Sequence, residues 1–78
     1  MIELLFFAQL REEVGAASLT IDASEITVEQ IKKQYLAKYE MDELLKSAMV
    51  AVNEEYAAED TVVHAGDTVA FIPPVSGG

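Results

Sequence analysis

The sequence predicts a single α+β domain in which one main helix packs on a mixed sheet. The chain has 78 residues, enough for one small domain. Short apolar runs near both ends are typical of buried strands, and an amphipathic helical pattern lies between them. Because no repeat or linker interrupts this part, we expect a domain over residues 1–72 and an extended tail over residues 73–78.

The first elements are a strand, a short helix and a second strand. IELLFF is apolar on both faces beyond Glu3 and predicts a central strand. AQLREEVG contains helix formers followed by Gly15, the residue type that commonly follows a helix end. SLTID alternates and is rich in β-forming residues, so it predicts a strand paired with the first as in a hairpin.

The main helix is predicted over ITVEQIKKQYLAKYE. Thr27 and Gln30 have the spacing of a capping box, and Ile26 and Ile31 that of a hydrophobic staple. An apolar stripe on one helical face is then expected to pack on the sheet: Val28, Ile31, Tyr35 and Tyr39, with Leu36 beside it.

The second half of the chain predicts three further strands. They are AMVAVN, which turns at Asn53 and Glu54, a short strand in EEYAA, and TVAFI. HAGD before the last strand predicts a turn in which Gly66 is free to adopt a positive φ. This element order is that of the β-grasp, or ubiquitin-like, fold, in which the first and last strands lie side by side and parallel.

Charge and composition exclude several classes of ligand. The net charge is −9, whereas binding to nucleic acid or to an anionic membrane needs clustered cations. The chain has no cysteine and one histidine, so we predict no metal site. No apolar run is long enough to span a membrane, and the start does not resemble a signal peptide, so we expect a cytoplasmic protein. The hydrophobic content of 51% leaves apolar residues for a core, for a docking face or for both.

Conventional catalysis is not predicted. The chain has four serines but only one histidine, His64, that could act as their general base. The sequence contains no nucleophile elbow and no phosphate-binding glycine loop. The paired carboxylates occur in polar contexts typical of solvated surface, and His64 is expected to be an exposed turn residue.

The C-terminal segment FIPPVSGG carries the most specific signal. Pro73 and Pro74 cannot extend a strand ladder and favour a stiff, extended conformation. No charged side chain follows Ile72, and Gly77 and Gly78 have no Cβ that would obstruct a narrow channel. The reactive group at the tip is the α-carboxylate, which becomes an acyl donor when a partner uses ATP to form an acyl-adenylate. The tail therefore predicts a carboxyl group presented to another protein's active site.

FFAQLRE, VAVNEEY and VAFIPPVSGG resemble the small subunits of molybdopterin synthases, over the whole chain. The resemblance implies a β-grasp sulfur carrier that is not an enzyme on its own. It implies two partners: an adenylating enzyme related to ubiquitin activators, which uses ATP, and the large subunit of a heterotetrameric synthase. The sulfur is carried as a C-terminal thiocarboxylate and passes to cyclic pyranopterin monophosphate. No permanently bound cofactor is implied.

Carried onto this chain, the resemblance implies that Gly78 is adenylated and then thiocarboxylated. It also implies an insertion path formed by the rest of the tail: Pro73, Pro74, Val75, Ser76 and Gly77. Phe7, Arg11 and Ile72 would contact the partner around the base of the tail. From the residues alone, Phe7 and Ile72 equally fit a core, and Arg11 equally fits a salt bridge to a helix carboxylate.

Two related functions and one simpler function remain as alternatives. The small sulfur carrier of thiamine synthesis shares the fold and the Gly-Gly end. A ubiquitin-like modifier would join its terminal glycine to lysines of other proteins. A plain binding module would have an inert tail.

Overall fold

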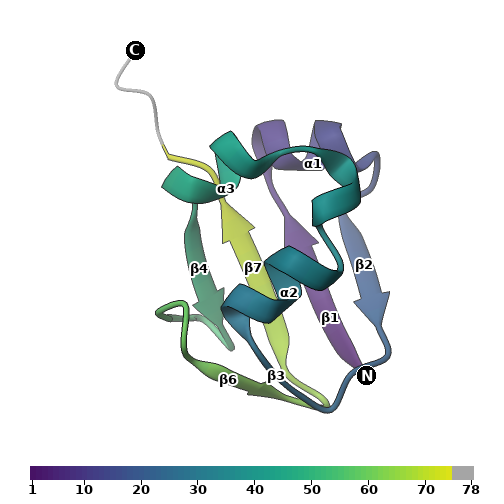
Figure 1. Cartoon of the computed structure of the whole chain (residues 1–78), viewed down its shortest axis with the longest axis vertical. Helices are drawn as coiled ribbons and strands as arrows, with labels where there is room; N and C mark the ends of the chain where they lie inside the picture. Colours follow the sequence, from purple (N-terminus) through teal and green to yellow (C-terminus); the bar gives the residue numbers. More distant parts are fainter. Residues whose placement is uncertain (75–78) are drawn as a thin grey trace.

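A computed structural model describes residues 1–74. Five strands form a mixed sheet, and Figure 1 shows the helices on one face of it. The strand order is β2-β1-β7-β4-β5. The first and last long strands, β1 and β7, are parallel neighbours, and every other pair in this sheet is antiparallel. The predicted β-grasp architecture is therefore confirmed. The strands are β1 (Ile2–Phe6), β2 (Ser18–Ile21), β4 (Met49–Val52), β5 (Glu55–Tyr56) and β7 (Thr68–Ile72).

Three α-helices and a 3-10 turn cover the sheet. Figure 1 shows α2 crossing one face, with α1 and α3 near the end at which β7 finishes. None of the helices within residues 1–74 is long and apolar enough to cross a bilayer. The bounds are α1 (Ala8–Val14), α2 (Val28–Gln34), η1 (Ala37–Tyr39) and α3 (Asp42–Ser47).

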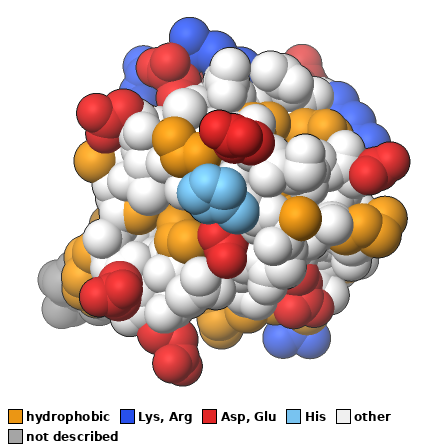
Figure 2. All heavy atoms as spheres, turned by 90° about the horizontal axis from the view of Figure 1, so that it is seen from below, with side chains coloured by type: hydrophobic (Ala, Val, Ile, Leu, Met, Phe, Trp, Pro, Cys, Tyr) orange, Lys and Arg blue, Asp and Glu red, His pale blue; other side chains and the backbone are white. Residues whose placement is uncertain are grey.

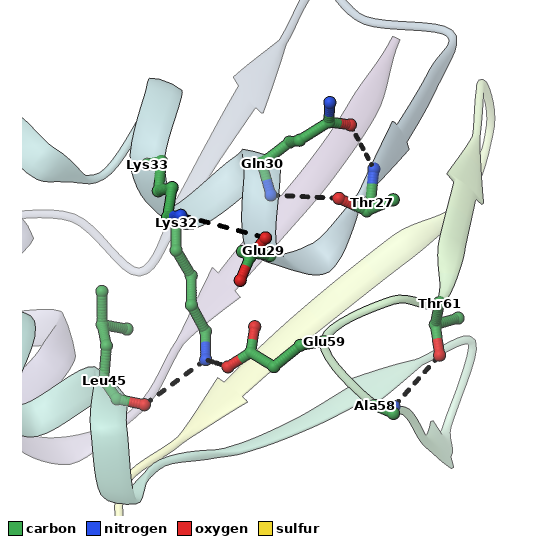
Figure 3. Close-up of polar contacts among 9 residues, drawn as sticks. All are labelled: Thr27, Glu29, Gln30, Lys32, Lys33, Leu45, Ala58, Glu59 and Thr61. Atoms are coloured by element: carbon green, nitrogen blue, oxygen red, sulfur yellow. Dashed lines mark hydrogen bonds and ion pairs between the residues drawn. The ribbon is translucent and has the colours of Figure 1, made fainter.

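Local signals place the starts and ends that the sequence predicts. Thr27 and Gln30 form the expected capping box: the Gln30 amide donates to Thr27 Oγ1 (3.1 Å), and the Thr27 amide donates to Gln30 Oε1 (3.0 Å; Figure 3). α1 ends with Gly15 at φ 83°, in the left-handed region that favours glycine. Gly66 also has a positive φ, 93°, in the predicted turn before β7.

The main helix is shorter than predicted. α2 ends at Gln34, and the chain continues through η1 into α3, which the sequence reading missed. The bend places Leu36, which is fully buried, and Met41 in the core, whereas Tyr35 and Tyr39 are only partly buried. Core packing therefore overrides the continuous helical pattern.

A second sheet of two short strands, also missed, closes one end of the core. β3 (Glu25–Thr27) pairs antiparallel with β6 (Val62–His64), so that Ile26 lies opposite Val63. Both of these side chains are buried. His64 is exposed, as predicted, although it ends a strand rather than lying wholly within a turn.

The core lies between the sheet and the helices. Alternate residues of β1 and β7 point into it: Leu4, Phe6, Val69 and Phe71 are all buried. The rings of Phe6 and Phe71 stack with their centroids 5.6 Å apart. Because side chains alternate across a strand, the residues between these four lie on the opposite sheet face.

Candidate functional site: the open sheet face and the base of the tail

The sheet ladder around β7 stops where the prolines begin. The last β1 partner is Phe6, opposite Phe71, and the last β4 partner is Met49, opposite Ile72. Beyond these positions β1 passes toward α1, and the chain before β4 belongs to α3. Pro73 is buried and Pro74 is exposed. Pro73 and Pro74 therefore lie beyond the regular ladder, and their lack of an N–H group removes no hydrogen bond from the sheet.

The sheet face opposite the helices carries a shallow groove, which we call the open-face groove. It has a volume of about 390 Å³ and runs over β1, β7, β4 and β5. Most of its lining is apolar, and Glu54 is its one charged residue. The lining residues are Leu5, Phe7, Ala51, Asn53, Glu54, Tyr56, Thr68, Ala70 and Ile72. Such a surface is suited to binding an apolar face of another protein.

Two of the predicted interface residues, Phe7 and Ile72, meet in this groove. Phe7 precedes α1 in an extended conformation (φ −124°, ψ 152°), so its side chain continues the alternation of β1 onto the open face. It is 47% exposed, and Ile72 is partly exposed. The alternative that they belong to the hydrophobic core is therefore wrong for Phe7 and incomplete for Ile72.

Arg11 lies apart from the groove. It is exposed on α1, at the end of the sheet where β7 finishes (Figure 1), but it does not line the groove. Within residues 1–74 it forms no ion pair, so the alternative of a salt bridge to a helix carboxylate is not found. The other predicted tail residues, Val75, Ser76, Gly77 and Gly78, lie outside the residues that the structure describes.

Tyr56 is a groove residue that the sequence reading missed. It is 73% exposed, the largest exposure among the large hydrophobic residues described. It lies on the edge strand β5, within the acidic segment EEYAAED. The sequence did contain a signal for this exposure: an aromatic residue in such a polar segment is rarely buried.

A hydrogen-bonded cluster fixes the far end of the groove. Asn53 donates from Nδ2 to Asp67 Oδ1 (3.0 Å) and accepts from the Thr68 amide at Oδ1 (3.1 Å). The His64 amide donates to Asp67 Oδ2 (2.9 Å). The hydrogen bond from the His64 amide, followed by the one from Asn53, lowers the pKa of Asp67 below its ordinary value of 3.8.

Charges are distributed unevenly over the molecule. The lysines all fall in the helical layer: Lys32, Lys33, Lys38 and Lys46. The charged residues of segment 47–74 are all acidic: Glu54, Glu55, Glu59, Asp60 and Asp67. Figure 2, a view from the end opposite to the finish of β7, shows carboxylates spread over the surface, with lysine and arginine only at its margins. The negative charge of this end would favour the approach of basic surfaces.

The open-face groove carries few polar side chains. Its polar side chains are Asn53, Glu54, Tyr56 and Thr68, and the first is committed to the cluster with Asp67. Within residues 1–74, no three histidine or carboxylate side chains converge as metal ligands would. The arrangement places a mostly apolar surface directly beside Ile72, the last residue before the tail.

Comparison with known proteins identifies the family. Residues 4–78 match the ThiS family. The chain is similar to the molybdopterin synthase sulfur carrier subunit of Escherichia coli, with 38% identity over 100% of both chains. It is also similar to the corresponding subunit of Arabidopsis thaliana, with 34% identity over 99% of this chain and 82% of the relative.

A solved structure agrees with this result. SAMP1 from Haloferax volcanii superimposes with a TM-score of 0.84 and 28% identity, covering 99% of this chain and 98% of SAMP1. A second solved structure, of small archaeal modifier protein 1 from H. volcanii, superimposes with a TM-score of 0.82 and 25% identity, covering 95% of this chain and 97% of that protein. The chain belongs to the ThiS family.

Proposed function

We propose that this member of the ThiS family is the sulfur carrier subunit of a molybdopterin synthase. Gly78 would carry sulfur as a C-terminal thiocarboxylate and deliver it to cyclic pyranopterin monophosphate. Full-length similarity to relatives named molybdopterin synthase sulfur carrier subunit supports this function over the thiamine-type carrier. The chain would act as a co-substrate, with the catalytic groups for the pterin supplied by its partner.

Sulfur loading requires two steps at the tip of the tail. An adenylating enzyme joins the Gly78 carboxylate to the AMP part of ATP and releases pyrophosphate. A sulfur nucleophile then attacks the acyl carbon, and AMP leaves. Gly78 has no Cβ to crowd that carbon. Since the chain has no cysteine, it cannot hold sulfur as a persulfide, which supports the thiocarboxylate form.

The observation that carries the proposal is the position of the open-face groove beside the tail. Ile72 connects the two, because it lines the groove and, as the last residue of β7, directly precedes the tail. A large subunit that binds Phe7, Tyr56 and Ile72 would therefore hold the tail's base against its own surface. The segment Pro73 to Gly77 would line the insertion path. Four fully extended residues after Pro74 reach at most roughly 14 Å, which is enough to enter a partner's active site.

Arg11 would supply a polar contact at the edge of this interface. It lies on α1, near the end of the sheet where the groove meets β7 (Figure 1). Its guanidinium is suited to bidentate pairing with a partner carboxylate. The contact would fix orientation beside an otherwise apolar face.

A ubiquitin-like modifier is the second candidate. The structural similarity to SAMP1, a protein named as a small archaeal modifier, favours it. In this function the activated Gly78 would acylate a lysine amine of another protein and release its activating group. The same adenylation step would serve both functions, so the product distinguishes them.

Intact mass after reconstitution tests the proposal. The chain is incubated with its adenylating enzyme, ATP and a sulfur donor, and then with the large subunit and the pterin precursor. We expect one oxygen of the chain to be replaced by sulfur, and molybdopterin to form as the sulfur is lost again. An adenylate that gives only isopeptide-linked products would instead establish the modifier. If the chain is never adenylated, neither function holds.

A further inference from the structure

We propose that Lys32 is a positioning residue for the tail. It clamps the end of α3, and α3 in turn holds the strand that pairs with the last residue of β7. Its consequence for activity rests on the proposed function, whereas its consequence for the tail's base does not.

Lys32 differs from the lysines near it in burial and in contacts. Its Nζ lies 2.7 Å from Glu59 Oε1 and donates to the Leu45 carbonyl oxygen at 3.4 Å (Figure 3). Its side chain is 14% exposed. Lys33 and Lys46 are 74% and 73% exposed, and their nearest carboxylate oxygens are 3.9 Å and 3.8 Å away. Exposed ion pairs of this length contribute little to stability, so Lys32 is the one of these three lysines with close, partly buried contacts.

Three segments meet at Lys32: α2 itself, the segment before β6 that contains Glu59, and α3. The first two are already fixed to each other. The Glu29 amide donates to the Glu59 carbonyl oxygen (3.0 Å), and the Val28 amide donates to that of Thr61 (3.1 Å). These bonds fasten the segment before β6 to the start of α2. The contact to Leu45 is therefore the one that brings the third segment, α3, under the control of Lys32.

α3 needs such a contact because its own stabilisation is weak. It has six residues, and its N-cap residue, Met41, makes no side-chain cap hydrogen bond. Hollows of about 410 Å³ and about 440 Å³ are lined in common by Lys32 and Glu59. Packing alone therefore leaves room beside the end of α3, and a cation at the terminal carbonyl restricts it.

The end of α3 is linked directly to the base of the tail. Only Ala48 separates α3 from β4, and its amide donates to the same Leu45 oxygen (3.3 Å). The Asn53 amide donates to the Thr68 oxygen, so these two residues form a hydrogen-bonded pair beside the β4–β7 ladder. Hydrogen-bonded pairs occur at every second position of an antiparallel ladder, and this spacing makes Met49 and Ile72 such a pair. That pair is the last one before Pro73. A shift of α3 would therefore move the final support of the tail.

The experiment compares Lys32→Met with two control variants and with one variant that keeps the charge. Lys33→Met makes the same change of charge one residue away, at an exposed position. Thr27→Ala removes the α2 cap and should lower the melting temperature by roughly 4–8 °C without touching α3. Lys32→Arg keeps the charge and should restore wild-type behaviour. Glu59→Gln provides a milder second test in case Lys32→Met does not fold.

The first measurement is amide hydrogen exchange in the isolated chain. In Lys32→Met we expect exchange at Ile72 to accelerate at least about tenfold more than at Phe71, whose ladder partner is β1. In Thr27→Ala the two amides should change by the same factor. Equal acceleration of both amides in Lys32→Met, or in Glu59→Gln if Lys32→Met is unfolded, would overturn the proposal.

The second measurement is steady-state adenylation, followed by pyrophosphate release. Lys32→Met should lower kcat about tenfold or more, because small misplacements of a reacting group are costly, while KM stays within about twofold. Lys33→Met should match the wild type. If the wild type is adenylated and Lys32→Met has no more effect than Thr27→Ala, the positioning role is overturned but the carrier function stands. If the wild type is not adenylated, the carrier function fails and the exchange measurement decides the positioning role alone.

Discussion

The two ends of the five-stranded sheet are built for different purposes. At the end where β7 begins, backbone and side-chain hydrogen bonds tie together residues that are distant in the sequence: Asn53 with Asp67, the Gly66 amide with the Met1 oxygen (2.8 Å) and the Glu3 amide with the Asp67 oxygen (3.2 Å). At the end where β7 finishes, the neighbouring strands leave the sheet, and Phe7 and Met49 are each 47% exposed. The first end is closed by internal bonds, and the second is left available for a partner.

This difference shows how a small domain can separate stability from function. A closed turn end and core can hold the fold while the other end exposes apolar surface and a chain terminus. Residues of the turn end should then affect melting more than sulfur transfer. Residues of the tail end should affect partner binding and transfer more than melting.

The largest expected effect is on partner binding, from Phe7→Asp. The change replaces an apolar side chain of the open-face groove with a charged one, and loss of the apolar contact together with desolvation of the carboxylate should weaken binding to the large subunit about a hundredfold or more. The fold should survive, because Phe7 is the N-cap of α1 and aspartate is a favoured N-cap residue. Titration calorimetry with the large subunit measures the affinity.

Val62→Asp is the matched control for Phe7→Asp. Val62 is also an exposed hydrophobic residue (43%), but it lies on β6, away from the tail. It should leave the affinity close to that of the wild type. Equal weakening by both variants would mean that the groove is not the docking face.

The next effect is on stability, from Asn53→Ala. The change removes both side-chain hydrogen bonds of Asn53 and leaves alanine at φ 51°, in a region that asparagine tolerates better. We expect a loss of about 1–3 kcal/mol and a clear drop in melting temperature, measured by thermal and denaturant unfolding. Because Asn53 also lines the far end of the groove, transfer is measured well below the melting temperature and with saturating large subunit, where it should be unchanged. A transfer defect under those conditions would break the separation of the two ends.

A smaller effect is expected from salt. With a net charge of −9, the chain should be steered toward basic partner surfaces, and raising ionic strength should slow association roughly tenfold. Dissociation should change less, because the uncharged residues of the groove hold the complex. Stopped-flow measurements across ionic strength would show both rates. An association rate that does not depend on salt would contradict steering.

The smallest effect is on the pH dependence of stability, from Asp67→Asn. The folded-state pKa of Asp67 is lowered, so its contribution is complete above 3.8 and is lost as the pH falls through the lower folded value. Asp67→Asn should therefore reduce stability at pH 7, and the difference from the wild type should shrink in strong acid. Denaturant unfolding at neutral and acid pH checks this. A difference that stays constant would show that ionised Asp67 does not contribute.

The sequence predicted the elements that have strong local signals. The capping box at Thr27, the helix end at Gly15 and the apolar runs of β1 and β7 each follow from a few neighbouring residues. α3 and the β3–β6 pair were missed because six-residue and three-residue elements are too short for periodicity to identify. Tertiary packing also decided where α2 ends.

The same distinction holds for the candidate site. Phe7 and Ile72 were predicted from the resemblance of FFAQLRE and VAFIPPVSGG to the small subunits of molybdopterin synthases, whereas the residues alone fitted a core equally well. Tyr56 was missed because its exposure follows from its place on a two-residue edge strand. Lys32 could not be found from local pattern, since its partners lie 13 and 27 residues further along the chain.

Deletion of Gly78 tests the division between fold and carrier most directly. Every core residue remains, so the melting temperature should not change. The new terminus falls one residue short, a loss of roughly 3.3–3.6 Å of reach, whereas about 1 Å of misplacement can already cost a catalytic step a hundredfold. We therefore predict unchanged melting, retained binding to the large subunit, and loss of adenylation, thiocarboxylate and molybdopterin together. Full sulfur transfer by the deleted chain would contradict the account and make the tail an inert end.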